Sequence, residues 1–142
     1  MSRRSRAREV VVQVLYEDDL NPDRSPEVAD QFLCNRLNND QELIDFARSL
    51  LAGVRKHREE IDKLLIERAD NWTLERMAVT DRNILRLAIY EMLHREDIPP
   101  VVSINEAVDI AKKFSTQDSG KFVNGILDRV KGELMRPARV VK

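Results

Sequence analysis

Arginine is concentrated at the start of the chain, where residues 3–16 read RRSRAREVVVQVLY. Arg3, Arg4, Arg6 and Arg8 crowd this segment of a protein whose formal net charge is only −1. The planar guanidinium group binds phosphate oxygens through two parallel hydrogen bonds, and the neutralised phosphates release counterions. The cluster therefore predicts contact with nucleic acid. The plainer alternative is a solvated N-terminus that keeps the chain soluble.

A second candidate surface surrounds Phe122. Phe122 stands at the edge of an apolar arc on a predicted helix, with Lys121 opposite the arc and Asn124 pointing away from the core. The members of the arc are Val123, Ile126, Leu127, Val130 and Leu134. An aromatic ring beside a cation and an amide is typical of single-stranded RNA surfaces, although a core residue at the boundary gives the same pattern. Lys112 and Lys113 would extend this surface.

Patterns typical of catalysis or metal binding are weak. His57 and His94 are the two histidines, and no cysteine or carboxylate pattern places a metal-ligand set around either of them. The segment DSGK, 118–121, lacks the upstream glycine and the final Ser or Thr of a phosphate loop. Cys34 is the single cysteine, which excludes an intramolecular disulfide. We expect no catalytic site, no metal and no cofactor.

The composition indicates helices as the elements that position these side chains. The 142 residues suit one domain, and they include only four glycines and five prolines. Hydrophobic residues make up 42% of the chain, enough for a core, and no alternating pattern predicts strands. The apolar stretches are too short for a membrane span, and no hydrophobic signal core follows the arginines. The simplest expected location is the cytoplasm.

Hydrophobic spacing predicts an all-α protein of about seven helices. The first covers about 3–19 and ends at Asn21-Pro22, and Ser25-Pro26 begins the second. Residues 38–40 should end that helix, and the apolar run at 83–93 indicates a central helix. Ser103 and Glu106 have capping-box spacing and should open the next helix. In the last helix, Gly125 suggests that another backbone approaches closely.

Several of these segments together resemble the NusB family of bacterial transcription antitermination factors. The arginine-rich start resembles the N-terminal helix of that family. Its C-terminal signatures are matched by DRNILRLAIYEML, VSINEAVDIAKKFS and SGKFVNGILDRV, in the family's order and spacing. The resemblance implies two packed helical bundles in a single domain, the first at about 3–69 and the second at about 72–134. The basic tail at 135–142 maps to no family role, and we expect it to be disordered.

The resemblance also implies a function and a set of site residues. NusB-like proteins are not enzymes: they bind boxA, a single-stranded element of ribosomal-RNA transcripts, together with the ribosomal protein NusE. The pair nucleates a termination-resistant complex on RNA polymerase and supports ribosome biogenesis. The implied RNA surface comprises Arg3, Arg4, Arg6, Arg8, Tyr16, Lys113, Asp118, Lys121, Phe122 and Asn124. The implied NusE surface comprises Glu75, Arg76 and Asp81, and the family often has Glu at the position of Asp81.

Three points remain open at this stage. Some family members form homodimers that hide the RNA surface, so this chain is either a monomer or a homodimer. The same helical fold occurs as a domain of RNA cytosine methyltransferases, but this chain has no glycine-rich turn for a methyl donor. A protein-interaction module with merely solubilising arginines is the other alternative.

Because a carboxylate repels phosphate, Asp118→Asn should tighten RNA binding.

Overall fold

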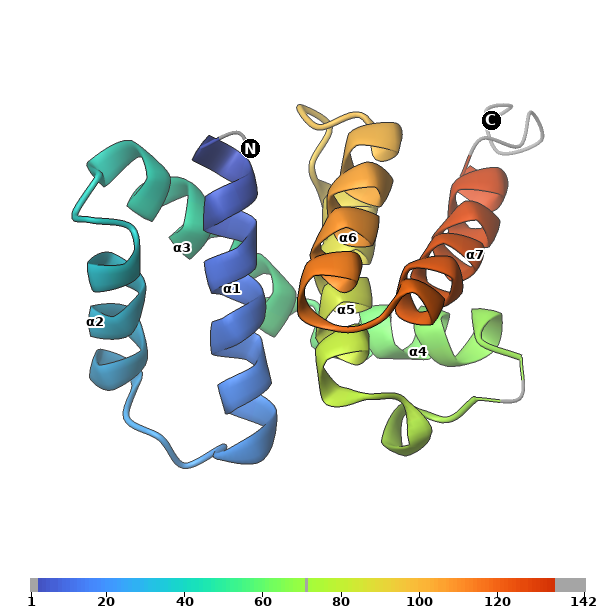
Figure 1. Ribbon diagram of the computed structural model, residues 1–142, viewed down its shortest axis with the longest axis horizontal. Helices are drawn as coiled ribbons and strands as arrows, with labels where there is room; N and C mark the ends of the chain where they lie inside the picture. Colours follow the sequence, from blue (N-terminus) through green and yellow to red (C-terminus); the bar gives the residue numbers. More distant parts are fainter. Residues whose placement is uncertain (1–2, 71, 135–142) are drawn as a thin grey trace.

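The computed structural model describes residues 3–70 and 72–134 (Figure 1). Within these ranges the chain forms seven α-helices and one short 3₁₀ helix, and no strand. The elements are α1 (Arg3–Leu20), α2 (Pro26–Arg36), α3 (Gln41–Lys56), α4 (Arg58–Arg68), η1 (Leu74–Arg76), α5 (Val79–His94), α6 (Pro100–Phe114) and α7 (Gln117–Leu134). The predicted all-α fold is confirmed. The predicted basic tail lies outside the described residues.

Helix α1 is buried along most of its length. Its residues Ala7, Val10, Val11 and Val14 are inaccessible to solvent. The helix packs against α2 and α3 on one side and against α5 on the other (Figure 1). It ends just before Asn21, as predicted, because Pro22 supplies no backbone N–H to continue it. The arginine-rich first turns are therefore attached to a rigid, deeply packed element.

The break between α2 and α3 is also confirmed, and its cause is visible in the backbone. Asn38 and Asn39 have φ angles of 54° and 56°, in the left-handed region that asparagine tolerates better than most residues. Asp40 then caps α3 by accepting a hydrogen bond from the backbone N–H of Leu43 at 3.3 Å.

At the start of α2, Pro26 occupies the first turn as predicted, but Ser25 makes no side-chain cap and bonds to Glu27 instead.

Helix α5 is the central element. It contacts α1, α3, α4, α6 and α7, and Ile84, Leu85 and Ile89 are among the most deeply buried side chains. Gly53 of α3 lets α5 approach, because a Cβ at that position would lie 2.1 Å from the Tyr90 ring. The prediction of a central helix at this segment is confirmed.

The predicted start of α6 was wrong by one turn. The helix begins at Pro100, with a proline in its first turn, and not at a capping box formed by Ser103 and Glu106. Ser103 lies inside the helix, where its Oγ donates a hydrogen bond to Glu91 Oε1 at 2.7 Å. The hydroxyl group that suggested a cap therefore joins α6 to α5.

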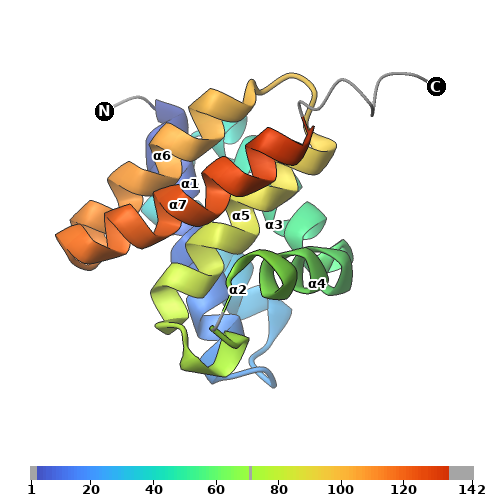
Figure 2. The same cartoon turned by 90° about the vertical axis from the view of Figure 1, so that its right-hand side faces the viewer.

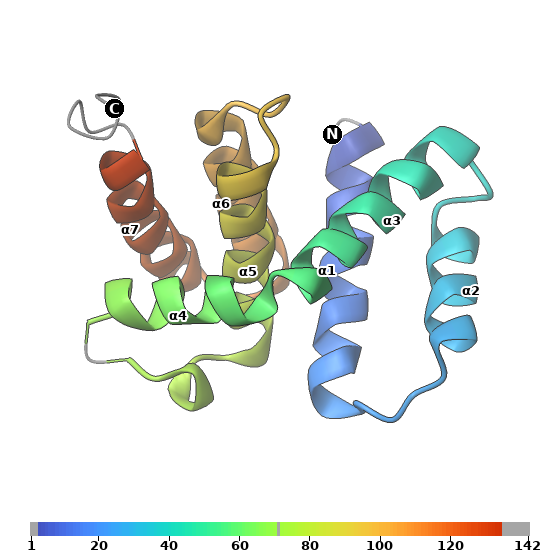
Figure 3. The ribbon, with the colours of Figure 1, turned by 180° about the vertical axis from the view of Figure 1, so that it is seen from behind.

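Helix α4 lies with the C-terminal helices. It crosses beneath α5 and α7 in Figure 3 and packs against both, and it also contacts α3. The resemblance assigns this helix to a first bundle at about 3–69, and that division stays a prediction. A single hydrophobic core runs through both halves. In the described part of the chain, no helix has the length and hydropathy needed to cross a bilayer.

A partly buried ionic network ties the end of α1 to α4 and α5. Asp19 accepts hydrogen bonds from Arg82 Nε at 3.1 Å and from Asn83 Nδ2 at 3.0 Å, and it pairs with Arg58 at 2.7 Å. Arg86 lies between Asp19 and Asp62 and bonds to both. Burial opposes ionisation of Asp19, but these donors and cations hold its pKa below the ordinary value. The network fixes α1 and α4 on α5.

Candidate nucleic-acid interface

The four N-terminal arginines do not form one surface. Arg8 is buried, with 4% of its surface exposed. Its Nε and Nη2 donate to Glu91 at 2.8 and 3.1 Å, and its Nη1 lies 3.3 Å from Glu106. Arg8 is therefore not exposed for the RNA contact that the resemblance implies, and that contact stays a prediction. Arg8 sits on the face of α1 that packs against α5 and α6, and its charge is neutralised inside the protein.

Arg3 and Arg4 are directed toward α3. Arg3 forms ion pairs with Asp40 and Glu42 at the start of that helix. Arg4 lies over the Phe46 ring, with its guanidinium carbon 4.3 Å from the ring centroid. Both residues are exposed, so phosphate can reach them, but carboxylates already neutralise Arg3 in part.

Arg6 faces the C-terminal helices and joins a charge cluster with α6. Its Nη1 lies 3.4 Å from Glu9 Oε1, and Lys113 Nζ approaches both Glu9 oxygens at 3.1 Å. Glu9 is buried, so one inaccessible carboxylate holds two cations from helices far apart in the sequence. The side chains of Arg6 and Lys113 remain 39% and 47% exposed, which leaves donors available to a ligand.

The cationic surface continues from α6 onto α7. The aliphatic stem of Lys112 lies over Gly120, where an added Cβ would be 3.2 Å from Lys112 Cγ. The next residue in α7 is the exposed Lys121. Figure 2 shows α6 and α7 side by side, with α1 behind them. We call the resulting set, Arg6, Lys112, Lys113 and Lys121, the basic edge.

Aromatic side chains flank the basic edge. Phe122 is half-buried at the margin of the core, as predicted, while Asn124 is exposed. Phe114, at the end of α6, is 41% exposed, and the centroid of its ring lies 5.6 Å from Lys113 Nζ. Sequence reasoning did not single out Phe114, although an aromatic residue directly after two lysines was visible. Cations next to exposed rings can hold phosphates while bases stack.

Asp118 brings negative charge to the same region. It is exposed in the first turn of α7, where a carboxylate is favoured by the helix dipole. Asp118 and Lys121 are three positions apart in the helix, so both side chains lie on one face of α7. Asp118 therefore reduces the positive potential of the basic edge.

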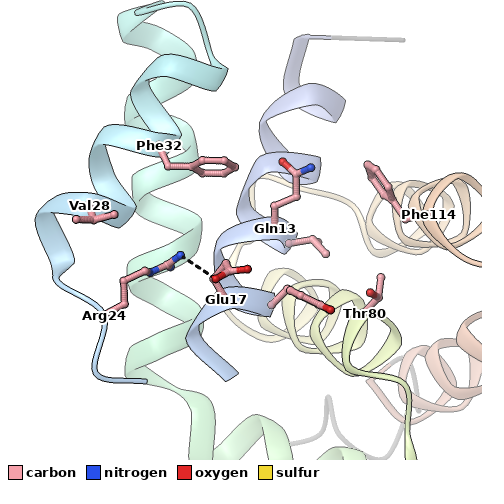
Figure 4. Close-up of a pocket in the computed structure, with 9 residues that line it drawn as sticks. Gln13, Glu17, Arg24, Val28, Phe32, Thr80 and Phe114 are labelled. Carbon is pink, nitrogen blue, oxygen red and sulfur yellow. Dashed lines mark ion pairs between the residues drawn. The ribbon is translucent and has the colours of Figure 1, made fainter. Parts of the chain in front are cut away.

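Tyr16 lies outside the basic edge and lines a groove between α1, α2, α5 and α6. The wall includes Val28 and Phe32 from α2, with Phe114 on the opposite side (Figure 4). Gln13 Oε1 is buried there and has no hydrogen-bond partner among the described residues. Phe114 lines the groove and also lies beside Lys113 of the basic edge, so the groove that contains Tyr16 adjoins the basic edge at the end of α6.

The residues expected to face a protein partner divide into two groups. Glu75 and Arg76 are exposed on η1, as that role requires. Asp81 is buried, with 6% exposure, and its Oδ2 accepts a hydrogen bond from Ser119 Oγ at 3.1 Å. Asp81 is therefore not exposed for the partner contact that the resemblance implies, and that contact stays a prediction. Burial raises the pKa of Asp81 despite the bond from Ser119, and its Oδ1 has no hydrogen-bond partner among the described residues.

The two histidines meet, which the sequence analysis did not predict. His57 and His94 stack with ring centroids 3.8 Å apart, and Glu60 Oε1 lies 2.8 Å from His94 Nε2 and 3.5 Å from His57 Nδ1. The sequence showed no pattern that would bring the two histidines and a carboxylate together, and the fold does so at Glu60. The ring planes differ by only 18°, so their in-plane lone pairs do not converge on one ion. The cluster is a hydrogen-bonded contact between α4 and α5.

Comparisons with known proteins agree with this architecture. Residues 5–131 match the model of the NusB family. The chain is 43% identical to the transcription antitermination protein NusB of Desulforapulum autotrophicum, with 92% of each chain covered. The NusB of Anaeromyxobacter dehalogenans is also 43% identical, with 97% of this chain and 96% of that protein covered.

Solved structures give the same result. A NusB from T. maritima superimposes with a TM-score of 0.82 at 40% identity, covering 94% of this chain and 92% of that chain. A structure of the antitermination factors NusB and NusE in complex with double-stranded RNA has a TM-score of 0.79 at 26% identity, covering 94% and 98%. The family model and the relatives match almost the whole chain, so this protein belongs to the NusB family.

Proposed function

We propose that this protein is a non-catalytic, RNA-binding transcription antitermination factor. It binds boxA-type single-stranded RNA of ribosomal-RNA transcripts together with NusE, and the pair assembles a termination-resistant complex on RNA polymerase. The observation that carries this proposal is the basic edge, where cations of the adjoining helices α1, α6 and α7 lie near the exposed Phe114 and the half-buried Phe122. The names of the relatives support the antitermination role, and the complex of NusB and NusE with double-stranded RNA supports binding to NusE and to RNA in general.

The proposed division of surfaces follows from exposure. RNA lies along the basic edge, with phosphates held by its cations and bases stacked on the neighbouring rings. NusE contacts the exposed residues Glu75 and Arg76 on η1. Because the two ligands occupy neighbouring surfaces, each stabilises the binding of the other, and the coupling is reciprocal. Arg3 and Arg4 add long-range attraction, while Arg8 has a structural role.

A gel-shift experiment tests the proposed function. The probe is a boxA-type single-stranded RNA, with the same sequence in duplex form as competitor, each measured with and without NusE. We expect the single strand to be shifted, NusE to tighten its binding about 5- to 150-fold, and the duplex to compete weakly. Binding that NusE leaves unchanged, or a duplex that competes as well as the single strand, would contradict the proposal.

A further inference from the structure

Trp72 is an unexplained feature of the surface next to the basic edge. It follows α4, is 45% exposed, and is the single tryptophan of the chain. Its ring meets the Phe122 ring edge to face, with centroids 5.6 Å apart and planes at 65°. The Arg76 guanidinium carbon lies 5.8 Å from the Trp72 ring centroid. Two aromatic rings from distant segments thus form one corner, next to a cation.

A groove of about 350 Å³ opens at this corner, within the size range of small-ligand sites. Lys121 and Arg129 line it together with Trp72 and Phe122. Among the described residues, no carboxylate pairs with Lys121, whereas Arg129 forms an ion pair with Asp70 at 2.8 Å. The groove therefore offers aromatic surface with a cation at its margin, which complements a base attached to a phosphate.

Gly125 is the second observation that indicates a ligand site, because no contact within the fold requires a glycine at this position. It lies in the interior of α7, where glycine lowers helix stability relative to alanine. Its φ is not positive, and an added Cβ would meet no atom within 4 Å, so the predicted close backbone approach is wrong. Gly125 nevertheless lines the groove beside Trp72. A side chain there would occupy the space left open in front of the rings.

We infer that this groove is a binding pocket for one unpaired nucleobase, with Trp72 and Phe122 as its stacking surfaces and Gly125 as its floor. The inference rests on the proposed RNA binding and deepens it. Lys121 links the two sites: it holds a phosphate of the strand on the basic edge, and the adjoining nucleotide turns its base into the groove. An RNA strand bound to the basic edge thus extends along α7 toward η1.

The experiment follows RNA binding by two independent readouts. Fluorescence anisotropy of a labelled boxA-type single-stranded RNA measures total affinity, and emission of Trp72 reports on the groove, since no other tryptophan contributes. We expect saturating RNA to quench Trp72 emission. Trp72→Leu should weaken affinity about 5- to 150-fold, the range for loss of one stacked base.

Gly125→Ala separates the ligand role from a structural one. The variant should raise Tm by about 2–4 °C, because alanine favours the helix, and should weaken RNA binding about 3- to 10-fold, because the methyl group projects into the groove. Gly132→Ala is the matched control. Gly132 lies in the same helix, an added Cβ also meets nothing within 4 Å, and it lines a neighbouring hollow with Arg68 and Glu133, away from the two rings. It should gain stability and keep wild-type affinity.

Each remaining result has a defined meaning. If RNA binds by anisotropy but leaves Trp72 emission unchanged, and Gly125→Ala binds like Gly132→Ala, the pocket is refuted and the proposed function stands. Absence of RNA binding by anisotropy refutes the proposed function, and the pocket with it. A change in Trp72 emission caused by NusE alone, with none caused by RNA, assigns the groove to a protein and overturns the inference.

Discussion

At the scale of the residue, identical side chains in one short segment have different roles. Arg6 and Arg8 are two positions apart, yet Arg6 is partly exposed and Arg8 is enclosed between Glu91 and Glu106. The arginine-rich pattern could not distinguish them, because the partners that bury Arg8 are supplied by α5 and α6, far away in the sequence. The affinity of this segment for RNA therefore cannot be estimated from its formal charge.

Asp81 gives a prediction about pH. Burial raises its pKa above the ordinary value of 3.8, so the fold favours the neutral carboxyl. The contribution of Asp81 to the free energy of unfolding is therefore complete at pH values below its ordinary pKa. That contribution is lost as the pH rises through the pKa of Asp81 in the folded state. Asp81→Asn stays neutral, and its carbonyl can still accept the bond from Ser119. We expect a higher Tm than wild type at pH 7 and little difference at pH 3.

The measurement is a thermal melt of both proteins across this pH range. Asp118→Asn is the matched control, because Asp118 is exposed in the same part of the molecule. An Asp81→Asn variant that is less stable than wild type at pH 7 would show that the charged form supports the fold. Weakened NusE binding with unchanged stability would restore Asp81 to the partner surface.

At the scale of the element, Arg8 fixes the arginine-rich helix to the rest of the protein. We expect Arg8→Ala to lower the free energy of unfolding by about 3–5 kcal/mol, because it leaves Glu91 buried without its cation. Arg4→Ala, which removes an exposed arginine from the same helix, should cost less than about 1 kcal/mol. Urea denaturation of both variants checks this, and equal losses would contradict the account of Arg8.

The helices themselves were largely predictable, and the reasons are local. The end of α1 at Asn21-Pro22, the break at Asn38–Asp40 and the apolar circumference of α5 all follow from residue preferences within a few positions. The start of α6 was mispredicted because Ser103 satisfies its hydroxyl through Glu91 of another helix. Capping patterns cannot reveal such a tertiary partner.

At the scale of the whole molecule, the candidate site depends on contacts that span the chain. Lys113 meets Arg6 only through Glu9, and Trp72 meets Phe122 only because α7 packs beside the end of α4. The sequence identified several of the participants by type. It could not predict that Arg8 and Asp81 would be buried, or that the arginines would diverge, because neither property is local.

The central claim is that the basic edge neutralises RNA phosphates, and the salt dependence of affinity tests it most directly. For single strands, the logarithm of affinity should fall with the logarithm of salt concentration, with a slope of about −0.7 per phosphate contact. We expect Lys113→Gln and Lys121→Gln each to weaken binding and to reduce the slope by about 0.7. Lys56→Gln, in the last turn of α3, should change neither. Slopes that are equal in all four proteins would contradict the claim.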